Sequence, residues 1–410
     1  MTIRRHLQRA GNTKRLLFAS YHFYLDPSNG ASITAREMLL ALAKRGWDVT
    51  TFCGCGLDFH DEHNPMQLLA DRNIVPGQIV KNQGSVPFSL VNFHDETLKS
   101  SVFLPDENQH IPSHEAGLAY LQLLEQVIAQ TQAQVLVTYG GYWMGGHLLK
   151  ISRDAGLKNV MFLMNFAYND AAFFRDFDLT IVLSQFASDW YAEKLGIHST
   201  PIPPMMDWNL IQCDNDMSER KYVTFVNPDP NKGVFVFAQI AKQLWLRRPE
   251  IPLLVVEARA GADWLARTGV DLYGVGNMSL MANTPDPRDF YRVTKIMLVP
   301  SLFKESFGRV AAEAMINGIP VIASNRGALP DVIGDAGITL KIPAQYTPET
   351  RVAPTPEEVE PWVHAIVDLW DNAALYNELS TKGQTRAKRW RPETIAEQYD
   401  NTLAKLIDSL

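Results

Sequence analysis

The sequence predicts an α/β protein built from two Rossmann-like domains, and three observations lead to this prediction. The chain has 410 residues, which is enough for two domains of ordinary size. Short apolar stretches alternate with segments of helical periodicity, and this alternation occurs twice along the chain. A proline-rich, polar stretch separates the two series. Alternating strands and helices indicate parallel sheets with right-handed crossovers, and we expect the two domains to face each other across a crevice.

The first domain is predicted over residues 1–205. Leu16–Ser20 has the composition of a buried strand, Ile33–Lys44 has helical periodicity that ends at Gly46, and Asp48–Phe52 returns as a strand. Between Asp58 and Ser113 the pattern weakens, and we interpret this region as variable loops and insertions over the sheet. Further apolar strands, with helical segments before and between the first two, are expected at Val135–Tyr139, Val160–Met164 and Leu179–Leu183.

Residues 206–220 are predicted to be a linker, because three prolines at 201, 203 and 204 precede them and the polar run Cys213-Asp214-Asn215-Asp216 lies within them. Asp214-Asn215-Asp216 has the Asp-x-Asp spacing used by metal-dependent transferases, but in a polar linker we interpret it as turn chemistry. The second domain is then predicted over residues 221–390, and the last helix, within 391–410, is expected to pack on the first domain. The expected elements of the second domain are strands at Tyr222–Val226, Leu253–Glu257, Met278–Ala282, Ile296–Pro300 and Pro320–Ala323, with helices at Val234–Arg247 and Phe307–Asn317.

The charge balance argues against nucleic acid as a partner. The chain carries 38 basic and 45 acidic residues, a formal net charge of −7, whereas nucleic-acid binding needs a basic face. A short basic arm within the first fifteen residues gives at most weak peripheral contact with an anionic membrane. Only three cysteines occur and no apolar run is long enough to span a bilayer, so a cytoplasmic location is expected.

The most informative segment is 299–337, where a predicted strand leads into a helix. Glu305 and Glu313 lie eight residues apart across this junction, and Ser306-Phe307-Gly308 opens the helix between them. The unpaired N–H groups and the dipole of a helix N-terminus favour an anion, and carboxylates accept strong hydrogen bonds from hydroxyl groups. This pattern fits a nucleotide-diphosphate sugar whose phosphates lie at the helix entry, with one carboxylate on the sugar hydroxyls and the other on the ribose hydroxyls.

The ordered series Glu-Ser-Phe-Gly-Arg-Val, Ala-Ala-Glu-Ala and Gly-Ile-Pro-Val-Ile-Ala-Ser over residues 305–324 resembles the retaining glycosyltransferases of the GT-B fold, specifically glycosyltransferase family 4. The resemblance covers nearly the whole chain and is strongest from Tyr222 to Gly337. It implies that Glu305 contacts the donor sugar and Glu313 the ribose. It also implies that Lys232, which precedes Gly233, binds the diphosphate.

The chain departs from the family pattern at one donor-binding position. The family usually has an arginine five residues before the lysine, where this chain has Asn227. The loss of a bidentate phosphate partner suggests that another cation substitutes, and Arg259 and Arg309 are the candidates. In the first domain, Gly30 lies where the family has a glycine-rich loop that approaches the donor phosphates. A glycine has no Cβ, so its backbone can come close to a ligand.

Two features of the first domain bear on the acceptor. Many family members have a histidine after the strand that we place at Val135–Val137, but this chain has Thr138-Tyr139-Gly140-Gly141 there. Aromatic side chains also crowd residues 142–143 and 166–177, where they either stack on an acceptor or belong to the core. In the second domain, the pocket for the nucleotide base is expected near Met278–Thr284.

The resemblance implies front-side transfer of a sugar, with retention, from a UDP, GDP or ADP sugar to a hydroxyl of a carbohydrate, lipid or small molecule. The departing diphosphate takes the acceptor proton, and neither a cofactor nor a metal is expected. Two alternatives stay open at this point: a sugar-nucleotide 2-epimerase of the GT-B fold and a non-catalytic nucleotide-sugar binder.

Overall fold

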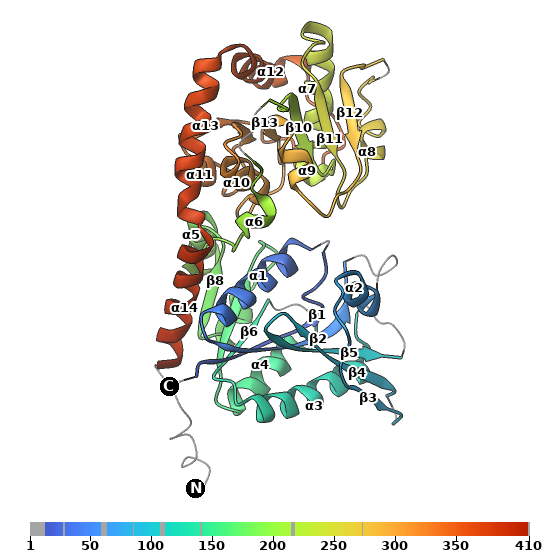
Figure 1. Ribbon diagram of the computed structural model, residues 1–410, viewed down its shortest axis with the longest axis vertical. Helices are drawn as coiled ribbons and strands as arrows, with labels where there is room; N and C mark the ends of the chain where they lie inside the picture. The colour runs from blue at the N-terminus through green and yellow to red at the C-terminus, as the bar shows by residue number, and fades with distance from the viewer. Residues whose placement is uncertain are drawn as a thin grey trace. The chain divides into compact units, whose positions relative to one another are not determined.

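The computed structural model describes residues 13–408 except residues 28, 59–63, 85, 107–110, 140–141, 215–217 and 273. The chain divides into two compact units, which apart from the last helix are coloured from blue to green and from yellow-green to red in Figure 1. Unit 1 contains Met1–Leu183, Trp190–Met205 and Pro392–Leu410, and unit 2 contains Ser184–Asp189 and Met206–Arg391. Each unit is an α/β domain of the Rossmann type, as the sequence predicts.

Unit 1 has a nine-stranded sheet in the order β3-β4-β5-β2-β1-β6-β7-β8-β9. The seven strands from β5 to β9 are parallel, and the central ones are apolar runs buried on both faces. The strands are β1 (Arg15–His22), β2 (Asp48–Gly56), β3 (Ile79–Asn82), β4 (Phe88–Asp95), β5 (Leu98–Pro105), β6 (Val135–Thr138), β7 (Lys158–Leu163), β8 (Leu179–Val182) and β9 (Thr200–Pro201).

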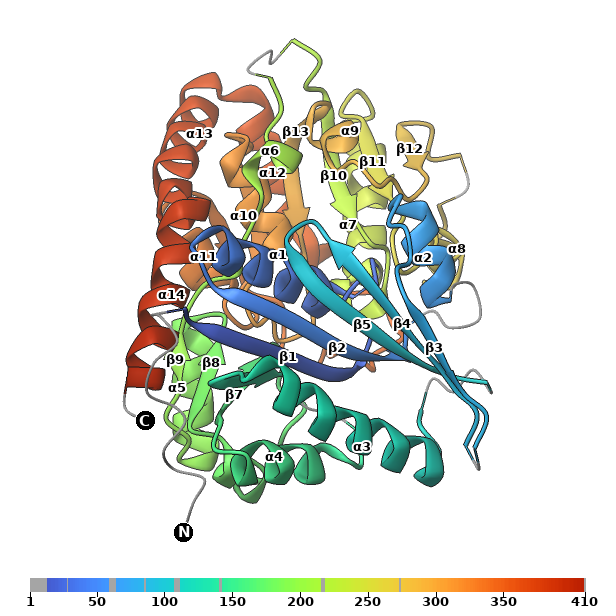
Figure 2. The ribbon, with the colours of Figure 1, turned by 60° about the horizontal axis from the view of Figure 1, so that its bottom comes forward.

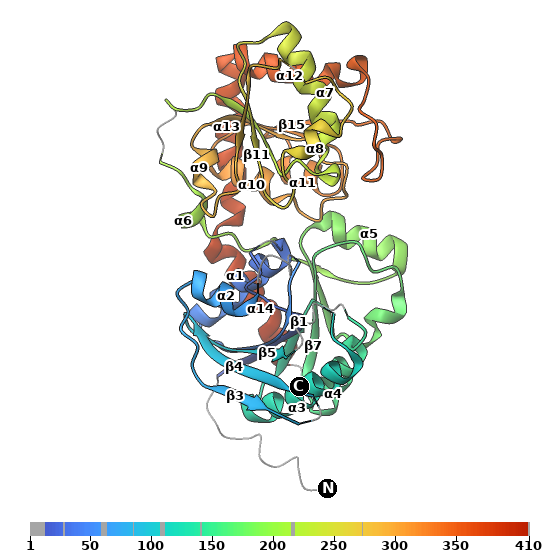
Figure 3. The ribbon, with the colours of Figure 1, turned by 90° about the vertical axis from the view of Figure 1, so that its right-hand side faces the viewer.

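Helices cover both faces of this sheet. Figure 2 shows α1 (Gly30–Lys44) on one face and α3 (His114–Thr131) and α4 (Gly145–Asp154) on the other, and α3 and α4 lie side by side (Figure 3). Asn29 caps α1 and Ser113 caps α3 through their side-chain oxygens. The remaining helices of this part of the chain are α2 (Pro65–Asp71), the 3-10 helix η1 (Ala171–Asp176) and α5 (Gln185–Leu195).

The interpretation of residues 58–113 as loops and insertions was wrong. This region contains α2 and the strands β3, β4 and β5, of which β3 and β4 pair antiparallel and extend the sheet. Every residue of β3 is exposed, and the buried positions of β4 are separated by half-buried or exposed ones. A one-sided antiparallel strand carries polar residues on its outer face, here Asn92 and His94, and Asp95 is polar although it is buried and paired with Arg36. These polar residues gave β4 the composition of a loop.

Unit 2 has a six-stranded parallel sheet in the order β12-β11-β10-β13-β14-β15. Five of its strands were predicted: β10 (Tyr222–Val226), β11 (Leu253–Val256), β12 (Met278–Met281), β13 (Thr294–Val299) and β14 (Val321–Ser324). The sixth, β15 (Ile338–Leu340), has three residues and was missed. The long helices are α7 (Val234–Arg247), α10 (Arg309–Ile316), α12 (Pro356–Asp371) and α13 (Ala373–Ala387), and the shorter ones are α6 (Trp208–Ile211), α8 (Asp263–Ala266), α9 (Arg288–Tyr291) and α11 (Leu329–Ile333), with 3-10 turns η2 (Pro230–Lys232) and η3 (Lys388–Trp390).

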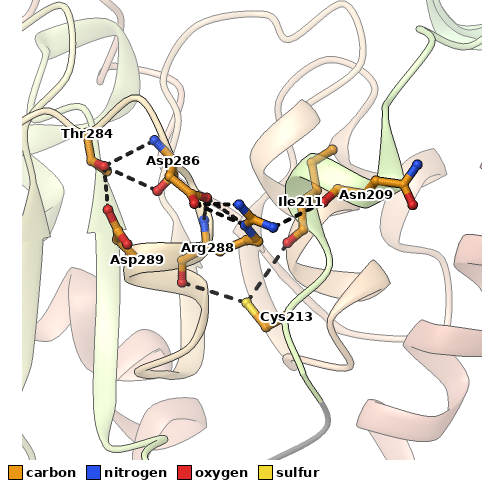
Figure 4. Close-up of polar contacts among 7 residues, drawn as sticks. All are labelled: Asn209, Ile211, Cys213, Thr284, Asp286, Arg288 and Asp289. Carbon is orange, nitrogen blue, oxygen red and sulfur yellow. Dashed lines mark hydrogen bonds and ion pairs between the residues drawn. The ribbon is translucent and has the colours of Figure 1, made fainter.

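The predicted linker, residues 206–220, is attached to unit 2 where the structure describes it. It contains α6, and the Asn317 side chain donates to the carbonyl of Ile211 and accepts the N–H of Cys213 at 3.2 and 2.7 Å. Figure 4 shows Arg288 donating to the carbonyl of Asn209 at 3.3 Å. Of the Asp-x-Asp run, residues 215 and 216 lie outside the described residues.

The last helix, α14 (Pro392–Asp408), returns to unit 1 and packs on α1. Its Asp400 is 8% exposed and accepts hydrogen bonds from Lys14, Arg45 and Trp47 at 2.7, 3.0 and 2.9 Å. This carboxylate therefore ties the end of the chain to the first strand and helix of the fold.

Candidate functional site

In unit 2, backbone contacts hold together the turns that follow the adjacent parallel strands β10 and β13. The carbonyl of Asn231 accepts the N–H groups of Leu302 and Phe303, each at 2.9 Å. Gly233 has φ +86°, and a Cβ there would lie 1.9 Å from the carbonyl oxygen of Pro300. A side chain at Gly233 would force the turns apart, so the close approach of the two loops depends on this glycine.

These turns bring Lys232 and Glu305 together. The Lys232 Nζ lies 2.6 Å from Oε1 of Glu305, and the Ser301 hydroxyl donates to the same oxygen at 2.7 Å. Glu305 is 8% exposed, and Ser301 is fully buried. The pair therefore presents an ammonium group and a carboxylate at the carboxyl end of the sheet, where ligands of open α/β sheets bind.

The backbone of Glu305 is held by a neighbour that the sequence analysis missed. Gly327 follows β14 with φ +62°, and a Cβ there would lie 2.2 Å from the carbonyl oxygen of Glu305. The next residue, Ala328, donates its N–H to that carbonyl at 2.8 Å, and Ser324 donates its hydroxyl to the carbonyl of Ser301 at 2.6 Å. The Asn-Arg-Gly turn after a predicted strand was the available signal for this contact.

Glu313 lies on α10 and is held by two different donors. The Tyr291 hydroxyl donates to Oε2 at 2.8 Å, and Nε of Arg309 donates to Oε1 at 3.1 Å. Glu313 is 8% exposed, and Tyr291 is fully buried. Burial raises the pKa of Tyr291 well above its usual value, and the charge of Glu313 raises it further. The ion pair with Arg309 offsets the negative charge of Glu313 in this structure.

The entry of α10 is built on Gly308. Its φ is +98°, no side chain of the described residues caps the helix, and a Cβ would lie 2.6 Å from Cδ2 of Leu329. Ser306 is half-buried. The Phe307 ring is 3% exposed and packs edge-on against Trp390 at 5.6 Å. As a side chain Phe307 belongs to the core, so only its backbone can contact a ligand.

Asn227, in the position where the family has an arginine, stabilises the local backbone. It adopts the left-handed conformation at φ +62°, which asparagine tolerates better than most residues. Its Oδ1 accepts the N–H of Ala260 at 2.9 Å. This bond ties the turn after β11, which carries the exposed Arg259, to the end of the neighbouring strand β10.

The structure thus places Lys232, Arg259, Glu305 and Asn227 at the carboxyl ends of adjacent strands in unit 2, with Glu313 one turn into α10. Gly30 is the predicted site residue that lies in unit 1, as the first residue of α1. A Cβ on Gly30 would meet nothing within 4 Å, so the fold itself does not require a glycine there.

The turn near the expected base pocket is held by its own polar residues (Figure 4). The Thr284 hydroxyl donates to Oδ2 of Asp289 at 2.6 Å, and Arg288 pairs with Asp286 at 2.6 Å.

In unit 1, the predicted aromatic group mostly packs on itself: Tyr168 and Phe173 stack at 4.5 Å and Phe174 is buried.

Among the described residues, His22, Asp26 and Asp58 of unit 1 form a group that could hold a metal ion, with ligand atoms within 4.8 Å of one another. No helix of the described chain is long and apolar enough to cross a membrane.

Comparison with known proteins gives a family match to the segment of unit 2 that carries Lys232, Glu305 and Glu313. Residues 214–386 match the family model described as Glycosyl transferases group 1. The lipopolysaccharide 1,2-N-acetylglucosaminetransferase of Salmonella typhimurium is 32% identical over 181 residues, which are 39% of this chain and 47% of that protein. The chain spans about half the length of the curated relatives that it matches.

Two solved structures cover almost the whole chain. The sucrose-phosphate synthase from Thermosynechococcus elongatus has a TM-score of 0.70 at 17% identity, over 97% of this chain and 100% of that one. The pneumococcal O-GlcNAc transferase GtfA, solved with UDP and GlcNAc, has a TM-score of 0.69 at 10% identity over the same shares. These likenesses confirm the predicted fold class, an α/β protein with the two Rossmann-like domains of the GT-B architecture.

Proposed function

We propose that this protein is a glycosyltransferase that takes a sugar from a nucleotide-diphosphate sugar bound by unit 2. One observation carries the proposal: Lys232 and Glu305 form an ion pair at the carboxyl ends of β10 and β13, next to the uncapped N-terminus of α10. The group 1 glycosyl transferase match spans this whole constellation. The relatives and the family model are transferases, so they do not favour the epimerase or the non-catalytic binder.

The donor is proposed to bind with its diphosphate on Lys232 and on the backbone N–H groups of residues 306–309. A diphosphate is a strong partner for an ammonium group, so it competes with Glu305 for Lys232. Glu305 is then available to accept hydrogen bonds from the sugar hydroxyls, while Glu313 accepts them from the ribose. Arg259, on the neighbouring turn, is the proposed second cation in place of the usual arginine.

The proposed transfer follows the retaining, front-side course of glycosyltransferase family 4. The acceptor oxygen bonds to the anomeric carbon as the bond from that carbon to the phosphate oxygen breaks, and the departing diphosphate takes the acceptor proton. Lys232 stabilises the charge that develops on the diphosphate. No cofactor enters this step, and Lys232 with the helix entry supplies the neutralisation that a metal would otherwise provide.

The proposed donor is a UDP, GDP or ADP sugar, and GtfA was solved with UDP. The proposed acceptor is a carbohydrate, a lipid or a small molecule with a free hydroxyl, bound by unit 1. The Salmonella relative is named for lipopolysaccharide, which combines carbohydrate and lipid. We propose a cytoplasmic location, because the chain has only three cysteines, and no nucleic acid as partner, because its formal net charge is −7.

The test is a screen of UDP, GDP and ADP sugars against mixed acceptors in the presence of EDTA. We expect turnover with one donor class, and proton NMR of the first product should show the anomeric configuration of the donor.

Replacing Lys232 with alanine should lower kcat about a hundredfold or more, because one electrostatic partner of the transition state is lost. An inverted product, or activity that returns only with added magnesium or manganese, would refute the retaining, metal-independent course. Absence of both transfer and donor hydrolysis would refute the function.

A further inference from the structure

A second polar constellation lies in unit 1, where the parallel strands β1 and β2 end side by side. His22 is the last residue of β1 and pairs with Gly56 of β2, and the register shifts between Ser20 and His22. Irregularities of this kind redirect a side chain at the end of a strand. Asp26 follows β1 by four residues and Asp58 follows β2 by two, so three possible metal ligands come from the ends of two neighbouring strands.

The three side chains converge. His22 Nε2 lies 3.1 Å from Oδ2 of Asp26, and the N–H of Asp58 donates to the same carboxylate oxygen at 2.8 Å. One ligand atom of each residue lies within 4.8 Å of the others. Metal bonds of about 2.0–2.2 Å to nitrogen and oxygen place tetrahedral ligands roughly 3.3–3.6 Å apart, so the Nε2–Oδ2 pair needs an adjustment of only a few tenths of an ångström.

Burial and access also fit an ion. The His22 and Asp26 side chains are 10% and 3% exposed, so two ligands have little freedom to move, while Asp58 is exposed and leaves an entry path. The second ring nitrogen of His22, Nδ1, has no hydrogen-bond partner among the described residues. The carboxylates also act on their surroundings: after burial, the charge of Asp58 is the largest factor that raises the pKa of Tyr142, and Asp26 raises it further.

We propose that His22, Asp26 and Asp58 form a binding site for one divalent transition-metal ion of the Zn²⁺ or Mn²⁺ kind. One imidazole with two carboxylates is a nitrogen and oxygen ligand set, which suits these ions better than Ca²⁺ or Cu⁺. Three protein ligands leave at least one coordination position open to water or to an oxygen of a bound ligand. The site lies in unit 1, whereas the residues proposed to bind the donor diphosphate lie in unit 2.

The experiment titrates the full-length protein, stripped of metal with EDTA and then dialysed, with Mn²⁺ by EPR and with Zn²⁺ by calorimetry. Mn²⁺ is included because thiolates bind it poorly, so the free cysteines do not imitate the site. We expect one equivalent per chain. Asp58→Asn should weaken binding at least tenfold, and His22→Ala should abolish it. His94→Ala is the matched control, an exposed histidine elsewhere in unit 1 that should bind as the wild type does.

Asp58→Asn is the decisive variant because the residue is exposed and the change keeps its shape, so metal-free melting temperature should equal that of the wild type. A wild type that binds neither ion below millimolar concentration would overturn the proposal. Metal binding by Asp58→Asn and His22→Ala that equals binding by the wild type would also overturn it. A variant that replaces both His60 and His63 would then report whether these two histidines bind the ion. Nucleotide binding, measured in the same samples, separates this outcome from a failure of the proposed function.

Discussion

Glu305 and Glu313 have the same exposure of 8% but different surroundings. Glu305 accepts hydrogen bonds from Lys232 and Ser301 at the ends of the strands, whereas Glu313 accepts them from Tyr291 and Arg309 on and beside α10. A nucleotide sugar extends from its sugar through its phosphates to its ribose. Two carboxylates with separate partners can therefore recognise separate parts of the same donor.

This separation predicts different losses for the two glutamates. Glu313→Ala should weaken binding of the free nucleoside diphosphate about tenfold, which is about 1.4 kcal/mol, because the proposed ribose contact is lost. Glu305→Ala should leave that affinity almost unchanged while it lowers transfer. Calorimetry with UDP, GDP and ADP measures the first effect, and initial rates measure the second. Glu360→Ala, an exposed carboxylate of unit 2 paired with Arg247, serves as control. Equal losses of nucleotide affinity in both variants would contradict the assignment.

The sequence located individual residues better than it located their partners. The helix entry and its two glutamates follow from a local pattern, but the contact between Lys232 and Glu305 joins residues 73 positions apart. Such a contact depends on the adjacency of β10 and β13, which a periodicity argument does not supply. The Asn227 position shows the converse. The resemblance alone presented Asn227 as the loss of a phosphate-binding arginine. Its left-handed conformation, φ +62°, and its bond to the N–H of Ala260 give a structural reason for an asparagine at this position.

At the scale of elements, the longer buried parallel strands were predictable, whereas the antiparallel strands β3 and β4, the neighbouring β5 and the short parallel strand β15 were not. Strands such as β1 and β10 are continuous apolar runs because helices cover both faces of their sheets. β3 is exposed at all four residues and β15 has only three residues, so neither leaves a signal in composition. The nine-stranded sheet of unit 1 therefore has an edge that the sequence did not reveal.

The packing of turns on turns gives a prediction at this scale. Gly327→Ala places a Cβ 2.2 Å from the carbonyl oxygen of Glu305 in a left-handed conformation, which itself costs about 1–2 kcal/mol. We expect a lower melting temperature and a loss of transfer, since the backbone of Glu305 must shift. Gly146→Ala is the matched control, because a Cβ there meets nothing within 4 Å and the residue has no positive φ. A Gly327→Ala protein as stable and active as Gly146→Ala would show that the turn is not tightly constrained.

At the scale of the whole molecule, the chain order and the domain order differ. The chain completes unit 2 at Arg391 and then returns to unit 1 through α14. Unit 1 therefore includes a helix that follows unit 2 in the sequence, and its full stability requires α14 to dock on α1. The Tyr399 ring meets Phe162 of β7 at 5.9 Å, and Asp400 is bonded to three side chains from the start of the chain.

Asp400 predicts how this docking responds to pH. Burial alone would raise the pKa of Asp400, but hydrogen bonds from Lys14, Trp47 and Arg45 outweigh burial and hold the pKa below its usual value. A carboxyl group whose pKa is lowered by folding stabilises the native state above its unfolded pKa, about 3.9, and loses that contribution as the pH falls through the lowered value. Asp400→Asn should therefore cost about 1–3 kcal/mol at pH 7, since three donors lose a charged acceptor, and less at pH 3, which lies below the unfolded pKa. Urea unfolding at both pH values, with hydrogen exchange of α14 amides to localise the effect, measures the difference.

Asp154→Asn is the control, because it removes an exposed ion pair with Lys150 and should have little effect at either pH. A deficit in Asp400→Asn that is as large at pH 3 as at pH 7 would mean that packing, and not the charge of Asp400, holds the last helix in place.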